Sequence, residues 1–272
     1  MWYPLAVREA RVIARTTAVI EPGGVLGELT CAPPLTLRQV RSEVRDRCEL
    51  RLVGTAAGPL ARDDLSVWLR LRPGARAVLR AAGATLAQGR DRGDASALSI
   101  RADLAEGAEL VADPGALVVC QGSRIDVRVE LTLGAAAAVQ WRELIVLGRT
   151  GERSGRATLR WDVTRLGRPV LRQFVDLNPV GGPALTTRDE PAAQAGRTSQ
   201  VRPAAWAGLT AGRRVMACAL IADPRAAPRT VVASPTAVAQ RIDDHTLLAT
   251  VLDDDAARAT RQLDDLCARA RG

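Results

Sequence analysis

Apolar and polar residues alternate with a period of two over several stretches in the middle of the chain. Residues 98–104, 125–133 and 157–164 place Leu, Ile, Val, Ala or Trp at every second position, with charged or hydroxyl residues between them. Successive side chains of a β-strand point to opposite faces, so this alternation is typical of a strand that buries one face. The pattern predicts half-buried strands in this region.

A short phrase containing Gly-Ala recurs three times between these strands. The phrases occupy residues 73–78, 106–111 and 133–139. A second glycine follows the glycine of each phrase after 14 or 15 residues, at Gly89, Gly122 and Gly148. Glycines at fixed intervals indicate corners where the backbone needs a positive φ or approaches a neighbour closely. Strands separated by regular corners predict a mainly β fold of stacked antiparallel or solenoid-like sheets.

The remaining segments are also predicted to be mostly β, with a short helix at the end of the chain. Strands or hairpins are predicted at residues 1–30, 32–38, 48–53, 167–177, 214–222 and 229–233, with one hairpin corner at 167–169. Residues 178–203 lack periodicity and predict a long surface loop. Acidic residues at 253–255, followed by apolar residues at helical spacing, predict a helix over about 254–270. We expect residues 1–272 to form a single domain.

The formal net charge is +8, and every basic residue is arginine. A basic chain can bind nucleic acid by neutralising phosphates. Here, however, the arginines are interspersed with acids and aromatic residues are few, so we expect no nucleic-acid binding. A basic surface that docks onto an acidic protein partner is the favoured interpretation of the charge.

The five cysteines are widely spaced and form no Cys-x-x-Cys pair, which excludes a disulfide framework and a recognisable zinc site. Early charges interrupt any signal-peptide core, and no apolar run approaches the length of about 18 residues that spans a bilayer. We therefore expect a soluble, cytoplasmic protein with reduced thiols and no membrane contact.

The sequence offers little catalytic chemistry. The single histidine, His245, follows two aspartates, but there is no Gly-x-Ser-x-Gly elbow to complete a Ser-His-Asp relay. Four carboxylates, of Asp63, Asp64, Glu143 and Glu152, lie beside glycine-rich corners. They are candidates for transient contact with a divalent ion, and ordinary loop capping is the competing interpretation. We expect a protein that is not an enzyme.

Several motifs together resemble those of the urease accessory protein D family, called H in some bacteria. Residues 141–152 resemble its signature, in which a glutamate precedes Leu-Gly-Arg and a further glutamate follows. Four shorter segments agree in order and spacing, at residues 34–38, 71–75, 83–85 and 122–124. The chain departs from the family pattern at residues 57–63, where glycines are lost, and at 113–120, where a proline and an aromatic are lost. The chain is identified as a divergent member.

This resemblance implies a scaffold for urease maturation. It implies partners, namely accessory proteins F and G and apo-urease, with a possible dimer within that complex, and no tightly bound cofactor. It also implies assistance with nickel insertion, with Asp63, Glu143 and Glu152 as candidates on a transient Ni²⁺ path. Arg149, Gly148, Gly122 and Arg124 are candidates for interface or structural roles. The alternative is a β-scaffold that binds an acidic partner without any role in metal transfer.

Overall fold

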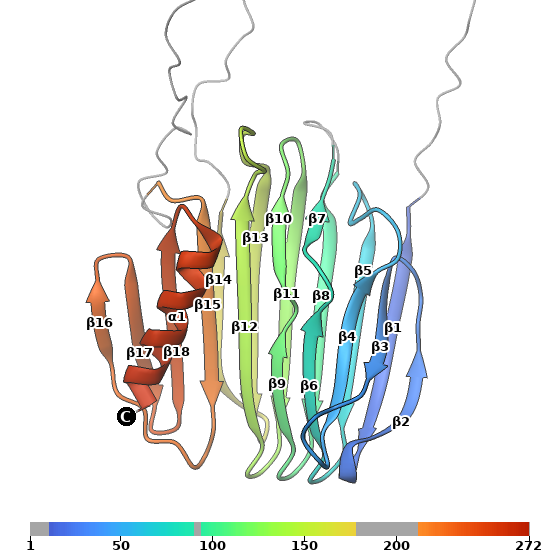
Figure 1. Cartoon of the computed structure of the whole chain (residues 1–272), viewed down its shortest axis with the longest axis vertical. Coiled ribbons are helices and arrows are strands. Elements are labelled where there is room, and N and C mark those ends of the chain that lie inside the picture. The colour runs from blue at the N-terminus through green and yellow to red at the C-terminus, as the bar shows by residue number, and fades with distance from the viewer. Residues whose placement is uncertain (1–10, 90–93, 178–211, 272) are drawn as a thin grey trace, which may run out of the picture.

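Two β-sheets stacked face to face form the body of the protein, and one helix packs on the outer side of the larger sheet (Figure 1). The computed structural model describes residues 11–89, 94–177 and 212–271. The predicted loop at 178–203 and the first ten residues of the predicted opening hairpin lie outside the described residues.

The smaller sheet, sheet A, has seven strands. In spatial order they are β14 (Arg168–Asp176), β13 (Arg156–Arg165), β11 (Arg124–Leu133), β8 (Ser96–Leu104), β5 (Asp64–Leu71), β1 (Ile13–Glu21) and β2 (Val25–Thr30). A short 3-10 turn, η1 (Pro22–Gly24), joins the last two.

The larger sheet, sheet B, has eleven strands. In spatial order its main path is β16 (Val231–Ser234), β17 (Ala237–Asp243), β18 (Thr246–Asp253), β15 (Val215–Ala222), β12 (Ala138–Leu147), β9 (Glu109–Asp113), β6 (Arg76–Ala81), β4 (Cys48–Gly54) and β3 (Leu35–Val40). Two short strands, β10 (Ala116–Val119) and β7 (Thr85–Ala87), pair beside β12 off this path.

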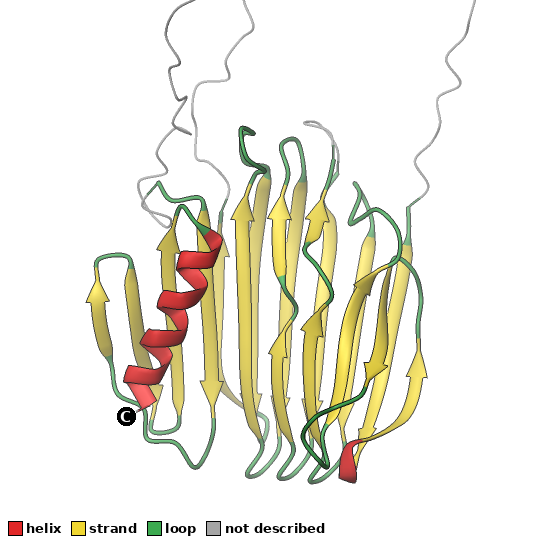
Figure 2. Ribbon diagram, in the orientation of Figure 1, coloured by secondary structure: helices red, strands yellow, loops and turns green. Residues whose placement is uncertain are grey.

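The middle of the chain winds as a solenoid between the two sheets. It passes from β5 to β6, back to β8, then to β9, β11, β12 and β13, so that each coil contributes a strand to each sheet (Figure 2). Neighbouring coils pair in parallel, whereas the flanking strands, such as β13 with β14 and β12 with β15, pair antiparallel. The solenoid-like prediction is confirmed, and antiparallel pairing is found on its flanks.

Parallel register stacks equivalent apolar side chains between the sheets. Leu65 pairs with Leu98, which pairs with Val127, which in turn pairs with Leu159. All four are buried. A shift of one residue would turn each strand's apolar set to the surface, so the observed alternation fixes this register.

The corners at one end of the solenoid follow the predicted repeat, with one correction. Gly74 and Gly107 hold a positive φ at the turn, but the residue in the equivalent place of the third coil is Ala136, with φ 52°. Gly134 instead lies where an added Cβ would be 2.9 Å from the backbone of Ala105. The third glycine therefore allows close packing of coils rather than a positive φ, and repeat spacing alone could not separate these two uses.

Two coils are interrupted within sheet B, which leaves β6 and β7 as one broken strand and β9 and β10 as another. The second break lies at Gly115, which has φ 83° and where a Cβ would be 2.6 Å from that of Ala81. The breaks in neighbouring coils thus lie against each other, and the outer face of sheet B is indented there.

The C-terminal helix α1 (Ala256–Arg271) covers a second apolar core on the outer face of sheet B. Every residue of β15 is buried, because alternate side chains face the space between the sheets and the helix. The helix buries Ala259, Leu263, Leu266 and Cys267 there, as predicted. It starts two residues later than expected because Asp253 still belongs to β18.

Other predicted elements are found with small shifts. The opening hairpin, the edge strand after the prolines and the strand from Cys48 are confirmed. The hairpin corner expected at 167–169 is Leu166–Gly167, both with positive φ, because Arg168 already pairs with Arg165. The strand expected at 229–233 spans Val231–Ser234. No helix in the described part of the chain is long and apolar enough to cross a membrane.

Candidate functional site

Strand β12 places a carboxylate inside the sandwich. Trp141 and Glu143 are two residues apart, so both side chains point inward, and they are 0% and 5% exposed. The Trp141 Nε1–H donates a hydrogen bond of 2.9 Å to Glu143 Oε1. A carboxylate in an apolar core is unfavourable unless it is hydrogen-bonded or neutralised, and the indole provides one such partner.

Burial controls the ionisation of Glu143. Loss of water raises its pKa to about 7, and Asp113 acts in the same direction, while the hydrogen bond from Trp141 opposes the shift. The carboxyl group therefore exchanges its proton near neutral pH, where an ordinary glutamate is fully ionised. Such a group can accept either a proton or a cation.

A thiol lies opposite this carboxylate. Cys218 on β15 pairs directly with Glu143 in the antiparallel register, and its Sγ is 3.7 Å from the Thr250 Oγ1 on β18. Burial raises the pKa of Cys218 to about 12, so the thiol stays protonated unless a cation displaces the proton. Oxygen and sulfur donors thus occur together in the core near the middle of β12.

Beyond the end of β12, the chain turns through a loop that carries the remaining motif residues. Gly148 has φ 79°, and a Cβ there would lie 2.8 Å from the carbonyl oxygen of Arg153, so only glycine fits. Arg149 Nε donates to Glu152 Oε1 at 2.8 Å, and this ion pair is largely exposed on the arginine side. The hydrogen bond from the Arg149 side chain lowers the pKa of Glu152 to about 2.

Arg214, immediately before β15, holds this loop in place. Its Nη2 donates to the carbonyl oxygens of Gly148 at 3.1 Å and Arg149 at 2.6 Å, and its Nε reaches that of Leu147. The neighbouring Arg213 forms an ion pair with Asp254, which lies between β18 and α1. The motif loop is therefore tied to the β15 edge and, through Arg213, to the C-terminal helix.

The same loop stacks on the preceding coil at the turn that contains Gly122. Gly148 N and Gly155 N both donate to the carbonyl oxygen of Val119, at 2.9 and 3.2 Å. Gly122 has φ 79°, as the turn requires. Arg124, the first residue of β11, is exposed and pairs in register with Arg156. The structure thus gives Gly122 a role in the turn and Arg124 a surface position.

Asp63 lies elsewhere, at the start of β5. Its side chain is buried, and its two oxygens accept hydrogen bonds from the backbone N–H groups of Val12 at 3.1 Å and Leu60 at 2.9 Å. Asp64, next to it, pairs with Arg11 on the surface. These contacts are those of a loop cap, the competing interpretation of the carboxylates near corners.

The described residues do not bring the candidate carboxylates together. Within residues 11–89, 94–177 and 212–271, no three His, Cys, Asp or Glu side chains are grouped closely enough to hold a metal ion. Glu143 is inside the sandwich, Glu152 is at the loop end of β12 and Asp63 lies just before β5 of sheet A. His245 is exposed in a hairpin turn, with its Nδ1 2.9 Å from the Ala226 carbonyl oxygen.

Sequence reasoning missed three residues that shape this region: Arg214, Cys218 and Gly155. Arg214 acts through backbone carbonyls, which leave no motif in a sequence. Cys218 faces Glu143 only through antiparallel pairing over 75 residues of chain. Gly155 was detectable only as a glycine near the motif, although a Cβ there would lie 2.3 Å from the Cys120 carbonyl oxygen.

Comparison with known proteins identifies the family. The sequence model of the family described as UreD urease accessory protein matches residues 10–272. A urease accessory protein UreD of Parafrankia sp. is 30% identical over 94% of this chain and 87% of its own length. Urease accessory protein UreD 3 of Streptomyces griseus is 31% identical over 94% and 95%, respectively. UreD 1 of the same species is 41% identical, over 48% of this chain and 51% of its own length. The chain therefore belongs to the UreD family of urease accessory proteins and has a role in urease maturation.

Proposed function

We propose that this protein is a non-enzymatic scaffold that bridges accessory proteins F and G to apo-urease and assists the insertion of Ni²⁺ into the urease active site. The family match over residues 10–272 carries the proposal. The rigid solenoid body, with side chains exposed on both outer faces, is suited to holding several partners at once.

Glu143 is the carboxylate best placed to contact a metal ion in transit. Both oxygens of Asp63 are occupied by backbone N–H groups, and Glu152 is paired with Arg149. Glu143 has one indole partner and exchanges its proton near neutral pH. Since a ligand must lose its proton to bind metal, Ni²⁺ would compete with that proton. A site with one carboxylate and a nearby thiol would bind weakly enough to release the ion.

A second candidate is a scaffold without metal contact. The net charge of +8 favours binding to an acidic protein surface. In this case the protein would organise the assembly while nickel travels by another route, and Glu143 would serve only to fix the sandwich core.

Reconstitution of urease activation tests the main proposal. Apo-urease, F, G, GTP, bicarbonate and Ni²⁺ are combined with or without the purified protein, and bound nickel and urease activity are measured. We expect complex formation and nickel loading only when the protein is present. Full nickel loading in its absence, or in a strain from which its gene is deleted, would refute the proposal.

Two substitutions separate the main proposal from the second candidate. Glu143→Ala should reduce nickel loading about ten-fold or more while the complex still forms, because the loss of one ligand weakens a metal site strongly. Glu130→Ala changes a glutamate on the outer face of sheet A. It is the matched control and should support normal nickel loading of urease. Normal loading by a folded Glu143→Ala variant would favour the scaffold without metal contact.

A further inference from the structure

The helix layer on sheet B covers only part of that sheet. Figure 1 shows α1 in front of the strands at the C-terminal end, while β12, β9, β6 and β4 continue beside it with no helix in front. The buried apolar residues that α1 covers belong to β15, β17 and β18, and Leu144 and Val146 of β12 pack against them at the edge of the layer. On the same face, the neighbouring strands β12, β9 and β6 carry charged residues such as Arg142 and Arg80, together with exposed Val111.

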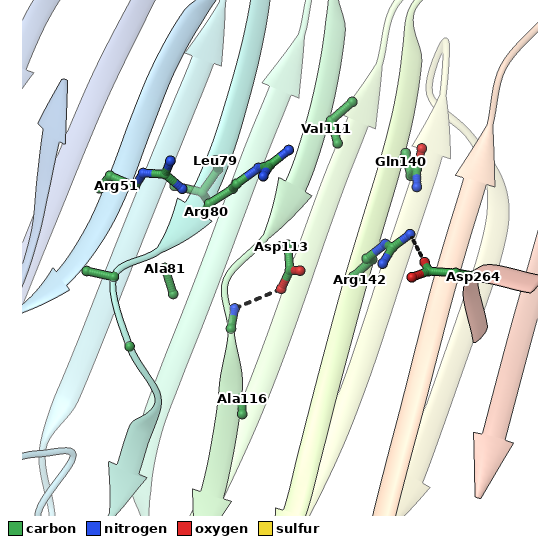
Figure 3. A pocket seen from close by; sticks show the side chains of 13 residues that line it. Arg51, Leu79, Arg80, Ala81, Val111, Asp113, Ala116, Gln140, Arg142 and Asp264 are labelled. Carbon is green, nitrogen blue, oxygen red and sulfur yellow. Dashed lines mark hydrogen bonds and ion pairs between the residues drawn. The ribbon is translucent and has the colours of Figure 1, made fainter. Parts of the chain in front are cut away.

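A groove of about 540 Å³ runs beside α1 on this uncovered part. It forms where the two broken strands of sheet B meet, so its floor contains the small residues Ala81, Gly115 and Ala116. Val111, which also lines the groove, is 37% exposed. One wall is an ion pair between Arg142 on β12 and Asp264 on α1 (Figure 3). Small floor residues allow another backbone to approach closely.

Two arginines, Arg51 and Arg80, line the opposite side and belong to a longer row. Arg38, Arg51 and Arg80 occupy directly paired positions on β3, β4 and β6. Arg51 pairs with Glu49, and the row ends at Asp113 of β9, which pairs in register with Arg80 and also lines the groove. Among the described residues, no carboxylate forms an ion pair with Arg38 or Arg80, so the arginine side of the groove keeps an excess of positive charge. Like charges at directly opposed positions destabilise a sheet. Carboxylates of a partner placed along this row would remove that repulsion.

The spacing of the layers favours a helix as the occupant. Packed helices lie about 8–10 Å apart, and neighbouring strands are about 4.8 Å apart, so a second helix beside α1 would be displaced by two strands. Since α1 covers β18 and β15, the second helix would lie over β12 and β9, where Gln140 and Val111 line the groove. The flank of that helix remote from α1 would face Arg80 and Arg51.

We propose that this groove, defined by Arg51, Arg80, Val111, Ala116 and Arg142, is the docking site for an acidic amphipathic helix of a protein partner. The helix completes the layer that α1 begins, with its small or apolar side on Val111 and Ala116 and its carboxylates toward Arg51 and Arg80. The proposal rests on the proposed function, because the partner is a protein of the maturation assembly.

Charge reversal with a matched control tests the docking site. Arg51→Glu/Arg80→Glu changes two paired arginines in the groove. Arg128→Glu/Arg160→Glu changes two arginines that are paired in the same way on the outer face of sheet A. In each pair one arginine also contacts a carboxylate two residues away, since Arg51 pairs with Glu49 and Arg160 with Asp162. The dissociation constants of both variants and of the unchanged protein are measured with purified F, G and apo-urease, and with a duplex DNA oligonucleotide. Thermal unfolding confirms that each variant is folded.

We expect the groove variant to bind one of these partners about ten-fold or more weakly and the control variant to bind it normally. Raising the salt from about 50 to about 300 mM should weaken partner binding by the unchanged protein more than binding by the groove variant. The reason is that salt screens exposed ion pairs. Val111→Asp should weaken binding of the same partner. In hydrogen exchange, that partner should protect β6 and β9.

The remaining outcomes overturn the proposal in distinguishable ways. Equal losses of affinity in both double variants would indicate a general charge effect. No loss of affinity in the groove variant would place the docking site elsewhere. In either case, complex formation would still support the proposed function. If the groove variant loses affinity only for a duplex DNA oligonucleotide, the groove binds phosphates and not a protein helix. If the unchanged protein binds none of the three partners, the proposed function and the docking site both fail.

Discussion

Ala136 is the clearest example of strain at a single residue. It holds φ 52° at a corner where the two equivalent residues are glycines. A residue with a Cβ pays roughly 1 kcal/mol to adopt this conformation, and glycine avoids that cost. Ala136→Gly should therefore raise the free energy of unfolding by roughly 1 kcal/mol, measured by urea denaturation. Gly107→Ala is the reciprocal control and should lower it by a similar amount; a loss of stability in both variants would contradict this assignment.

The buried carboxyl of Glu143 should make stability depend on pH. Its pKa is about 7 in the folded state against an ordinary value of 4.5, so the folded protein holds a proton that the unfolded chain releases. Below the pKa of Glu143 in the unfolded chain, the carboxyl is protonated in both states and does not affect stability. As pH rises from there to about 7, the buried carboxyl destabilises the folded protein by up to about 1.4 kcal/mol per pH unit. Glu143→Gln removes this titration and keeps the shape.

Urea unfolding at several pH values between about 5 and about 8 tests this expectation. The difference in unfolding free energy between Glu143→Gln and the unchanged protein should shift in favour of the variant as pH rises. A difference that is constant with pH would mean that the carboxyl titrates as an ordinary exposed group. Glu130→Gln serves as the control for a glutamate on the outer face.

At the scale of elements, Arg214 determines the order of the motif loop. Its guanidinium satisfies several carbonyl oxygens at the turn after β12. Arg214→Ala should lower stability by about 1–2 kcal/mol and increase amide exchange of residues 148–155, because those carbonyls lose a charged donor. Arg213→Ala is the control, since Arg213 makes an exposed ion pair worth less than about 1 kcal/mol. Equal exchange in both variants would show that the loop is held by other contacts.

The elements also show how far sequence patterns reach. Alternation predicted the strands of the solenoid because burial of one face follows directly from a period of two, as in residues 125–133. The family resemblance singled out Glu143, Gly148 and Arg149 because they belong to one motif, at residues 141–152. Contacts that join distant segments, such as Glu143 with Cys218 or Arg214 with the loop, depend on which strands become neighbours. A local pattern carries no information about that pairing.

For the whole molecule, stacked coils imply that stability decreases from the middle toward the sheet edges. β11 is paired on both sides, by β8 and β13, whereas β2 and β16 are edge strands with largely exposed side chains. Local opening is easiest where few buried contacts are lost. Amides of β8, β11 and β12 should therefore exchange about a hundredfold or more slowly than those of β2 and β16, measured by mass spectrometry.

A matched pair of valines shows whether the coils are coupled. Val129 is fully buried in the central ladder between Ile100 and Trp161, and Val232 on β16 is 71% exposed. Val129→Ala should cost roughly 2 kcal/mol and lower protection in β8 and β13 as well as in β11, because each coil stabilises its neighbours. Val232→Ala should leave protection unchanged. If Val129→Ala affected β11 alone, the coils would open independently, and the solenoid could not act as one rigid body between its partners.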